Sequence, residues 1–256
     1  MNSNDVNGKV LFEADSHQFI WLGADEEEEQ GVVQTNQYLI INNGRGTLVD
    51  PGGIHLFSRV VALVSRYIDL DKIDNIFFSH QDPDVSSGIA LWLGVTGAKI
   101  YISELWIRFI PHFGIIDDSR IVGIEALNGS LKLSSGNELK LIPSHFLHSC
   151  GNYSFYDPIS KTLFTGDIGA AVFPSNGQYL FVEDFNKHLE IMEGFHKRYM
   201  TSNVVIKKWL SKISNLDVKL IAPQHGALFK DENVDNFLNW FSELRCGIDI
   251  IDSIYV

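Results

Sequence analysis

The sequence predicts a mixed α/β fold, and three observations support this prediction. Short runs rich in β-branched and aromatic residues end in polar residues and pass directly into segments with helical apolar spacing, as Lys72–Phe78 does before Ser87–Leu93. The 256 residues contain no internal repeat and no low-complexity linker, so we expect a single domain over residues 1–256. Hydrophobic residues at 45% against charged residues at 20% describe a globular chain with a sizeable core, which excludes a disordered or fibrous protein.

The individual elements follow from turn signals and apolar periodicity. Gln37–Ile41 and Gly46–Val49 flank the turn residues Asn42–Asn43–Gly44, which predicts a β-hairpin. Asp50–Pro51–Gly52–Gly53 then ends the strand, and Leu56–Ile68 has the spacing of a helix. The remaining expected strands are 72–78, 99–102, 138–143, 153–157, 162–165 and 219–222, and the remaining expected helices are 87–93, 186–199, 204–214 and 234–246.

Net charge excludes two classes of partner. The chain has 20 basic and 32 acidic residues, a formal charge of -12, and so lacks the basic surface that binds nucleic acid or an anionic membrane. The single charge run, Asp25–Glu29, is expected to be a solvated loop. We therefore expect neither nucleic acid nor membrane as a partner.

Cysteine usage and apolar run length bear on location. Only Cys150 and Cys246 are present, so the chain has no disulfide framework and no cysteine set for an iron–sulfur or rubredoxin-type centre. The longest apolar stretch, Gly88–Ile102, is too short for the ~20 residues of a membrane-spanning helix. These features predict a cytoplasmic protein.

The most informative segment joins an expected strand to an expected helix at Ser79–His80–Gln81–Asp82–Pro83–Asp84. It places one imidazole and two carboxylates at alternate positions, and alternate side chains of an extended segment point to the same side. Pro83 stiffens this turn by fixing its own φ and favouring extended geometry at Asp82. The competing interpretation is an ordinary helix cap, with Asp84 bonding the first amides of the helix.

Three further donor residues follow expected strands in the same way. These residues are His148, Asp167 and His225. Nitrogen and oxygen donors in this mixture suit zinc, iron or manganese, and the carboxylates favour iron. Three imidazoles and three carboxylates suffice for two metal ions that share a bridging carboxylate, so we predict a dinuclear metal centre.

The order and flanks of these segments resemble the metallo-β-lactamase superfamily over nearly the whole chain. The resemblance is carried by Leu48–Val49–Asp50–Pro51–Gly52, by Tyr153–Ser154–Phe155–Tyr156–Asp157 and by Leu163–Phe164–Thr165–Gly166–Asp167. It implies a four-layered αββα sandwich with the metals at one edge, where strand-end loops from both halves meet.

Within that superfamily, the metal motif is similar to that of the flavodiiron branch. The hydrolases carry H-x-H-x-D-H and the flavodiiron proteins H-x-E-x-D-H, whereas His80–Gln81–Asp82–Pro83–Asp84–Val85 has a carboxylate at the middle position. The chain resembles in particular the stand-alone oxygen-binding di-iron proteins. This resemblance implies two non-haem iron ions, with His80, Asp82 and His148 on one, Asp84 and His225 on the other, and Asp167 as the bridge.

Two positions depart from the motif or compete with it. Val85 replaces a histidine and has no lone pair, which leaves three outcomes: an open second iron, a substitute ligand or water, or loss of the second metal. We favour the open iron, because Asp84, Asp167 and His225 are all present. His145 is the rival of His148 for the third ligand, and we place it behind the ligands because His148 fits the superfamily's spacing.

Three functions are consistent with such a centre. The favoured one is a cytoplasmic oxygen sensor that binds dioxygen at the open iron position and passes its state to a signalling partner. The second is an oxygen or nitric-oxide reductase, which needs a separate electron-donor protein because no glycine-rich phosphate loop is present and no FMN is expected in this chain. The third is a metal-dependent hydrolase of a thioester or phosphodiester. Whether the protein is an enzyme is left open.

Overall fold

The structure is a computed structural model of the chain and describes residues 8–23, 33–174 and 177–256. It divides into two compact units, Met1–Leu141 and Ile142–Val256, which are described in turn. The expectation that residues 1–256 form a single domain stays a prediction. The acidic run Asp25–Glu29 lies outside the described residues.

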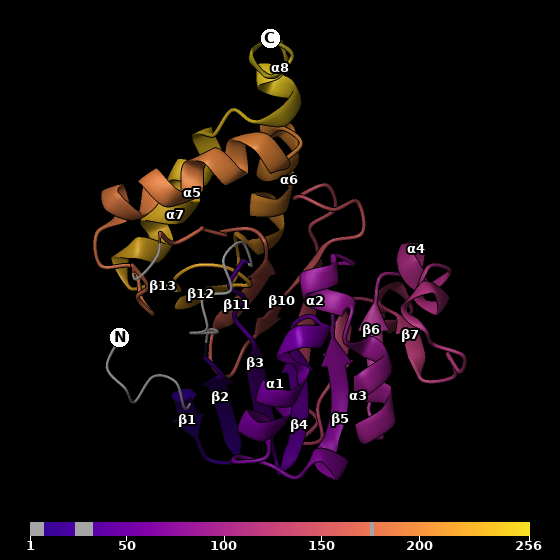
Figure 1. The fold of residues 1–256 in the computed structure, drawn as a ribbon. Helices are drawn as coiled ribbons and strands as arrows, with labels where there is room; N and C mark the ends of the chain where they lie inside the picture. The colour runs from indigo at the N-terminus through magenta and orange to yellow at the C-terminus, as the bar shows by residue number, and fades with distance from the viewer. Residues whose placement is uncertain (1–7, 24–32, 175–176) are drawn as a thin grey trace. The chain divides into compact units, whose positions relative to one another are not determined.

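The first unit is built on a seven-stranded sheet whose strands lie in chain order (Figure 1). Neighbouring strands run antiparallel from β1 to β4 and parallel from β4 to β7. The strands are β1 (Lys9–Ala14), β2 (His17–Trp21), β3 (Tyr38–Asn42), β4 (Arg45–Val49), β5 (Ile73–Phe77), β6 (Lys99–Ile102) and β7 (Ile121–Gly123). The parallel half brings the carboxyl ends of β4 and β5 to the same edge, from which the loops at residues 50 and 79 leave.

Helices cover this sheet and share a hydrophobic cluster with it. Val60 and Val64 of α1 lie in one buried cluster with Ile76 of β5 and Trp92 of α3. The helices are α1 (Phe57–Val64), α2 (Pro83–Ser86), α3 (Ile89–Val95) and α4 (Glu104–Ile107), and a hairpin pairs β8 (Ser130–Lys132) with β9 (Glu138–Pro143). Every residue of β3 is buried, so neither face of this strand is open to solvent.

The second unit combines a smaller sheet with three long helices. Its strands lie in the order β13–β12–β11–β10, and β11 and β12 are parallel. They are β10 (Tyr153–Asp157), β11 (Thr162–Gly166), β12 (Leu220–Pro223) and β13 (Phe229–Lys230), and the helices are α5 (Phe185–Tyr199), α6 (Asn203–Ile213), α7 (Glu232–Glu243) and α8 (Ile251–Ile254). The apolar faces of α5, α6 and α7 form one cluster with Leu163 and Ile221 of the sheet.

Most of the expected elements are confirmed, with boundaries shifted by a few residues. The hairpin is β3–β4, and Asn43 and Gly44 at its turn both have positive φ, at 51° and 73°, as the tight two-residue turn requires. The expected helix 56–68 ends at Val64. Strands β1, β2, β7, β8 and β13 were missed, and three of these have only two or three residues, too few to show an alternating pattern.

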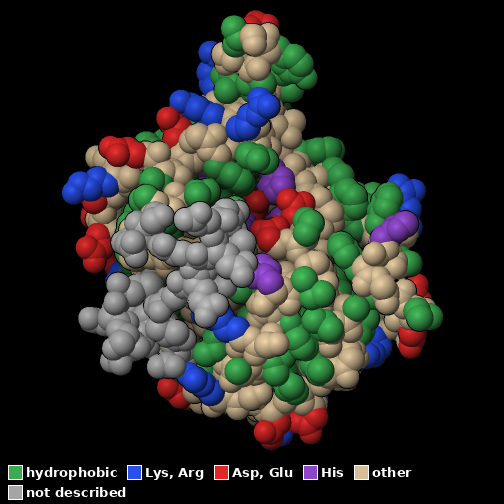
Figure 2. Space-filling model, viewed as in Figure 1, with side chains coloured by type: hydrophobic (Ala, Val, Ile, Leu, Met, Phe, Trp, Pro, Cys, Tyr) green, Lys and Arg blue, Asp and Glu red, His purple; other side chains and the backbone are tan. Residues whose placement is uncertain are grey.

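The C-terminal segment after α7 carries exposed apolar side chains. Ile248 is 63% exposed and Tyr255 is 83% exposed. Figure 2 shows hydrophobic side chains on this segment, with basic side chains next to them. None of the helices in the described ranges is long and apolar enough to cross a membrane.

Helix α5 carries two buried histidines, His188 and His196. The hydroxyl of Tyr179 lies 2.8 Å from Nδ1 of His188, whose ring packs edge-on against Phe229. Burial lowers the pKa of His188 to about 4, and the neighbouring His196 lowers it further. The folded protein therefore holds this imidazole neutral at pH values where an unfolded histidine is protonated.

We predict that His188 makes the protein less stable as the pH falls from about 6.5 to about 4. Over this range the unfolded chain binds a proton that the folded chain does not, so the free energy of unfolding falls, by an amount on the order of 3 kcal/mol at the lower limit. Urea unfolding of iron-free protein at several pH values measures the slope. His188→Gln should flatten it, and a slope no flatter than that of His112→Gln, an exposed control, would contradict the prediction.

Candidate metal centre

In the first unit, His80 is held by contacts that begin at the end of β4. The N–H of Ser79 donates to Oδ1 of Asp50 at 2.7 Å, and the N–H of Asp50 donates to the carbonyl of Phe77 at 2.9 Å. The hydroxyl of Ser79 hydrogen-bonds with Nδ1 of His80 at 2.9 Å. With Nδ1 engaged in this way, Nε2 is the nitrogen that His80 can offer to a metal.

The two carboxylates that follow His80 lie at the start of α2. Asp82 precedes the helix with an extended backbone and its Oδ2 lies 3.9 Å from Nε2 of His80, while Gln81 Nε2 donates to its Oδ1 at 2.8 Å. Asp84 is half-buried in the first turn of the helix. The expectation of an extended segment through Asp84 is therefore wrong, because Pro83 starts a helix at its preferred first position.

The helix-cap interpretation of Asp84 is also wrong. The residue at the N-cap of α2 is Asp82, and its side chain makes no capping hydrogen bond. The expected helix 87–93 is α3, Ile89–Val95, which follows α2 after a short break. The carboxylates of Asp82 and Asp84 are thus placed by the start of α2 rather than by a strand, and Oδ2 of Asp82 is the oxygen nearer to His80.

In the second unit, His148 lies on a short loop after β9. The loop is closed by the N–H of Ser144 donating to Asn152 and the N–H of Phe146 donating to Ser149, at 3.0 and 2.7 Å. The imidazole of His148 packs edge-on against the rings of Phe195 and Tyr199, with centroids 6.1 and 5.8 Å away. Aromatic contacts on the ring restrict its rotation, so the loop and α5 together fix the direction of Nε2.

Asp167 and His225 leave the ends of the parallel strands β11 and β12. The N–H of Gln224 donates to the carbonyl of Gly166 at 2.8 Å, and that of Ala171 to the carbonyl of His225 at 3.4 Å. Gly226 has φ +84°, and a Cβ there would lie 2.8 Å from the backbone nitrogen of Ala171. Only glycine fits this position, so the backbones that carry the two donors approach each other closely.

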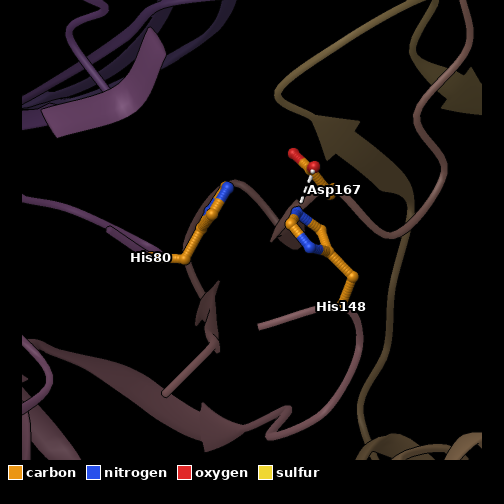
Figure 3. Close-up of side chains that lie close together, drawn as sticks. All are labelled: His80, His148 and Asp167. Atoms are coloured by element: carbon orange, nitrogen blue, oxygen red, sulfur yellow. Dashed lines mark ion pairs between the residues drawn. The ribbon is translucent and has the colours of Figure 1, made fainter. Parts of the chain in front are cut away.

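The two imidazoles of the second unit, those of His148 and His225, converge on the carboxylate of Asp167. Its Oδ2 lies 2.7 Å from Nε2 of His148, as the dashed line in Figure 3 marks, and its Oδ1 lies 3.6 Å from Nε2 of His225. His80, which Figure 3 also draws, belongs to the first unit. Each carboxylate oxygen faces a different imidazole, so Asp167 can offer one oxygen to each of two metal ions.

This donor set fits a metal. The side chains of Asp167 and His225 are only 5% and 7% exposed, and that of His148 is 14% exposed. Burying a carboxylate and neutral imidazoles away from water is costly unless they are paired with each other or coordinate a cation. Nitrogen and oxygen donors at this burial are those of a zinc, iron or manganese site.

The sequence also singled out Val85 and His145, neither of which forms an ion pair with Asp167 among the contacts described. Val85 is fully buried in the hydrophobic cluster of the first unit and provides no donor atom. His145 is half-buried and packs edge-on against the ring of Tyr153, with centroids 5.1 Å apart. Between the two histidines of the loop, His148 is the one whose Nε2 lies 2.7 Å from the carboxylate of Asp167.

Sequence reasoning missed the residues that support the donors. Nε2 of His196 accepts the N–H of Gly169, two residues after Asp167, at 2.9 Å, and its Nδ1 lies 2.9 Å from the carbonyl of Met192. Burial lowers the pKa of His196 to about 4, which keeps it neutral and able to accept this bond. The sequence signal for His196 was its position on the apolar face of α5, but a hydrogen bond to a backbone N–H cannot be predicted from residue types.

Comparison with known proteins identifies the family. Residues 33–226 match the model of the ODP family beta lactamase. A solved structure of the peroxy diiron species of the chemotaxis sensor ODP is 56% identical to the chain, covers 97% of it and 99% of its own length, and superposes with a TM-score of 0.85. A structure of the apo state of the chemotaxis sensor ODP from T. denticola is 55% identical over 96% of the chain and 98% of its own length, with a TM-score of 0.83.

More distant relatives are flavodiiron proteins. A flavo di-iron protein from Thermotoga maritima superposes with a TM-score of 0.76 at 20% identity, over 92% of this chain and 60% of its own. The anaerobic nitric oxide reductase flavorubredoxin of Aeromonas salmonicida is 26% identical over 80% of this chain and 40% of its own length. The chain spans about half the length, or less, of the curated relatives it matches. The metallo-β-lactamase-like α/β fold predicted from the sequence is confirmed.

The contact between Ser79 and His80 generates a test of the centre. Ser79→Ala removes the hydroxyl from Nδ1 of His80 and frees the ring to rotate, so the affinity for ferrous iron should fall about 10-fold to 100-fold. Anaerobic titration with ferrous iron measures this change. Ser242→Ala, which removes an exposed hydroxyl that donates to the carbonyl of Asn239, is the control, and equal affinities in the two variants would contradict the role given to Ser79.

Proposed function

Since the chain belongs to the ODP family of beta lactamase-fold proteins, we propose that it is a non-haem di-iron protein that binds dioxygen and acts as an oxygen sensor. The observation that carries the proposal is the convergence of His148 and His225 on opposite oxygens of Asp167. The 56% identity to the chemotaxis sensor ODP, over 97% of the chain, supports the same function.

We assign the donors of both units to one dinuclear centre. His80, Asp82 and His148 would hold one iron ion, Asp84 and His225 the other, and Asp167 would bridge them. The family match from 33 to 226 includes all six positions, which supports a joint role. Two ferrous ions held in this way would supply the electrons and the open coordination position that dioxygen binding requires.

The chain's own residues orient and shield these donors. Asp50 and Ser79 fix the ring of His80, and Gln81 donates to Oδ1 of Asp82, whose Oδ2 lies 3.9 Å from Nε2 of His80. Around His148, the stacked rings of Phe195 and Tyr199 pack edge-on against the imidazole, whose side chain is 14% exposed. Partial shielding from water would slow proton delivery to the site, which suits a protein that binds oxygen and releases it.

The sensing role assigns a location and a partner class. We propose that the protein works in the cytoplasm and that its partner besides dioxygen is a signalling protein. The second candidate, a reductase served by a separate electron donor, draws support from the similarity to the flavorubredoxin of Aeromonas salmonicida, which covers 40% of that protein. The two roles differ in whether oxygen is released or consumed.

The test of the function is anaerobic reconstitution with ferrous iron, followed by addition and removal of oxygen. We expect about two irons per chain and an absorption band that appears with oxygen and fades when oxygen is removed. Steady oxygen consumption that requires a reductant would identify the reductase instead. Uptake of zinc but not iron, with thioester or phosphodiester hydrolysis, would identify a hydrolase.

Asp167→Asn tests the bridge. The amide keeps the size of the side chain but loses the negative charge and one oxygen donor, so we expect the iron content to fall to about one ion per chain or less and the oxygen-dependent band to disappear. Iron analysis and the absorption spectrum measure both. Asp217→Asn, at an exposed carboxylate that pairs with Lys161, should leave both unchanged, and two irons in Asp167→Asn would contradict the bridging role.

Val85→His tests the open position. An imidazole that finds no metal in this apolar cluster costs about 1–3 kcal/mol, whereas one that reaches the second iron completes its ligands and changes oxygen affinity. Val60→His, at another fully buried valine of the same cluster, is the control for the cost of burial alone. An oxygen affinity in Val85→His equal to that of Val60→His would show that position 85 does not line the open site.

A further inference from the structure

We propose that a groove beside helix α6 binds an acidic amphipathic helix of a protein partner. The groove, called the α6 groove below, has a volume of about 620 Å³ and lies entirely within the second unit. One wall is the loop at 143–146 and the other is the face of α6. The proposal rests on the proposed function only in its last step, where the groove is linked to the metal centre.

The groove presents apolar side chains to solvent. Phe146 on the loop is 51% exposed and Val204 at the start of α6 is 75% exposed. The indole of Trp209 also lines the groove; it is almost fully buried and donates to the hydroxyl of Ser154, which holds the ring in place. A concave, apolar surface of this kind accepts the apolar face of a helix, whose anchors recur every three or four residues.

The rim of the groove is positively charged. Lys207, Lys208 and Lys212 line it, all are exposed, and α6 (Asn203–Ile213) contains no acidic residue. Within the described residues none of these lysines forms an ion pair, whereas Lys161, Lys187 and Lys197 each pair with a carboxylate. Lys208 and Lys212 are four residues apart on the helix, where like charges repel, and an acidic partner would relieve this repulsion.

Charge and shape together select the occupant. The chain as a whole has a net charge of -12, which opposes adsorption to an anionic membrane, and a flat bilayer cannot fill a concave groove. An amphipathic helix with glutamate or aspartate beside its apolar anchors complements both the lysines and the apolar floor. A lipid surface and a second copy of this chain are therefore outcomes of the test rather than the occupant we infer.

The wall of the groove is part of the loop that carries His148. Phe146 is two residues from His148, and its carbonyl accepts the N–H and the hydroxyl of Thr201 at 3.3 and 2.9 Å. Thr201 lies two residues before the first residue of α6, so the hydrogen bonds join the loop that carries His148 to the segment that leads into the second wall. A partner in the groove touches both walls, and a change in the loop on oxygen binding would alter its affinity.

The groove is tested with a fluorescein-labelled synthetic helix that carries leucine anchors at helical spacing and glutamates between them. Its affinity for the iron-free full chain is measured by fluorescence anisotropy. Lys208→Glu/Lys212→Glu should weaken binding about tenfold, and Val204→Ser should also weaken it, because these changes remove the charge complement and an anchor. Lys99→Glu/Lys132→Glu, a matched reversal of two exposed lysines in the first unit, should change the affinity less than about twofold.

Four results would overturn the proposal. The first two are failure of the wild-type chain to bind the labelled helix, and an equal loss of affinity for the helix in the two double variants. The third is binding of the wild-type chain to phosphatidylserine vesicles that Lys208→Glu/Lys212→Glu abolishes. The fourth is a wild-type dimer that the same variant dissociates. Because these measurements use iron-free protein, they hold whether or not the chain binds oxygen.

The link to the metal centre is tested by repeating the titration with ferrous protein before and after oxygen. We expect the affinity for the helix to differ at least about threefold between the two states. Equal affinities in protein that shows the oxygen-dependent band would overturn the link. Absence of that band would count against the proposed function. The difference in helix affinity between the two double variants would still decide whether the groove binds the helix.

Discussion

The structure depends on one electrostatic constraint, the burial of the Asp167 carboxylate between two imidazoles. A buried charge of this kind is costly unless cations or donors surround it, so the backbone around it must be held closely. The ends of the parallel strands β11 and β12 position this backbone. Gly226 allows the chain after β12 to approach Ala171 closely, and His196 accepts the N–H of Gly169. The helices of the second unit are thereby tied to the geometry of the donors.

In the first unit, a different set of groups positions His80. The sharp turn at Asp50, where φ is positive at 44°, directs its carboxylate to the N–H of Ser79, and the hydroxyl of Ser79 then orients His80. Both units therefore position a metal donor through a backbone amide and a side chain at a strand end. The α6 groove extends this arrangement to the surface, because its wall and His148, which we propose as a ligand, belong to one loop.

Sequence reasoning could predict the architecture and the donors but not what supports them. The strand Tyr153–Asp157 was predictable from its residue types, and so was the placement of His148, Asp167 and His225 after strands. That these side chains hold metal stays a proposal. The helix at Asp84 was missed, because a proline can end a strand or begin a helix. The contacts of His196 and of the α6 groove join segments that are distant in sequence or use backbone groups, which no local pattern records.

The claim on which the account depends is that the donors of the two units serve one dinuclear centre. Mössbauer spectroscopy of the protein reconstituted with ⁵⁷Fe and then oxidised tests it most directly, because two ferric ions held in one centre would couple their spins, whereas ions at separate sites would not. We predict a quadrupole doublet at liquid-helium temperature. In an applied magnetic field, its splitting should be that caused by the applied field alone, which identifies a coupled pair with a diamagnetic ground state. Spectra of uncoupled high-spin ferric ions, at any iron content, would contradict the shared centre.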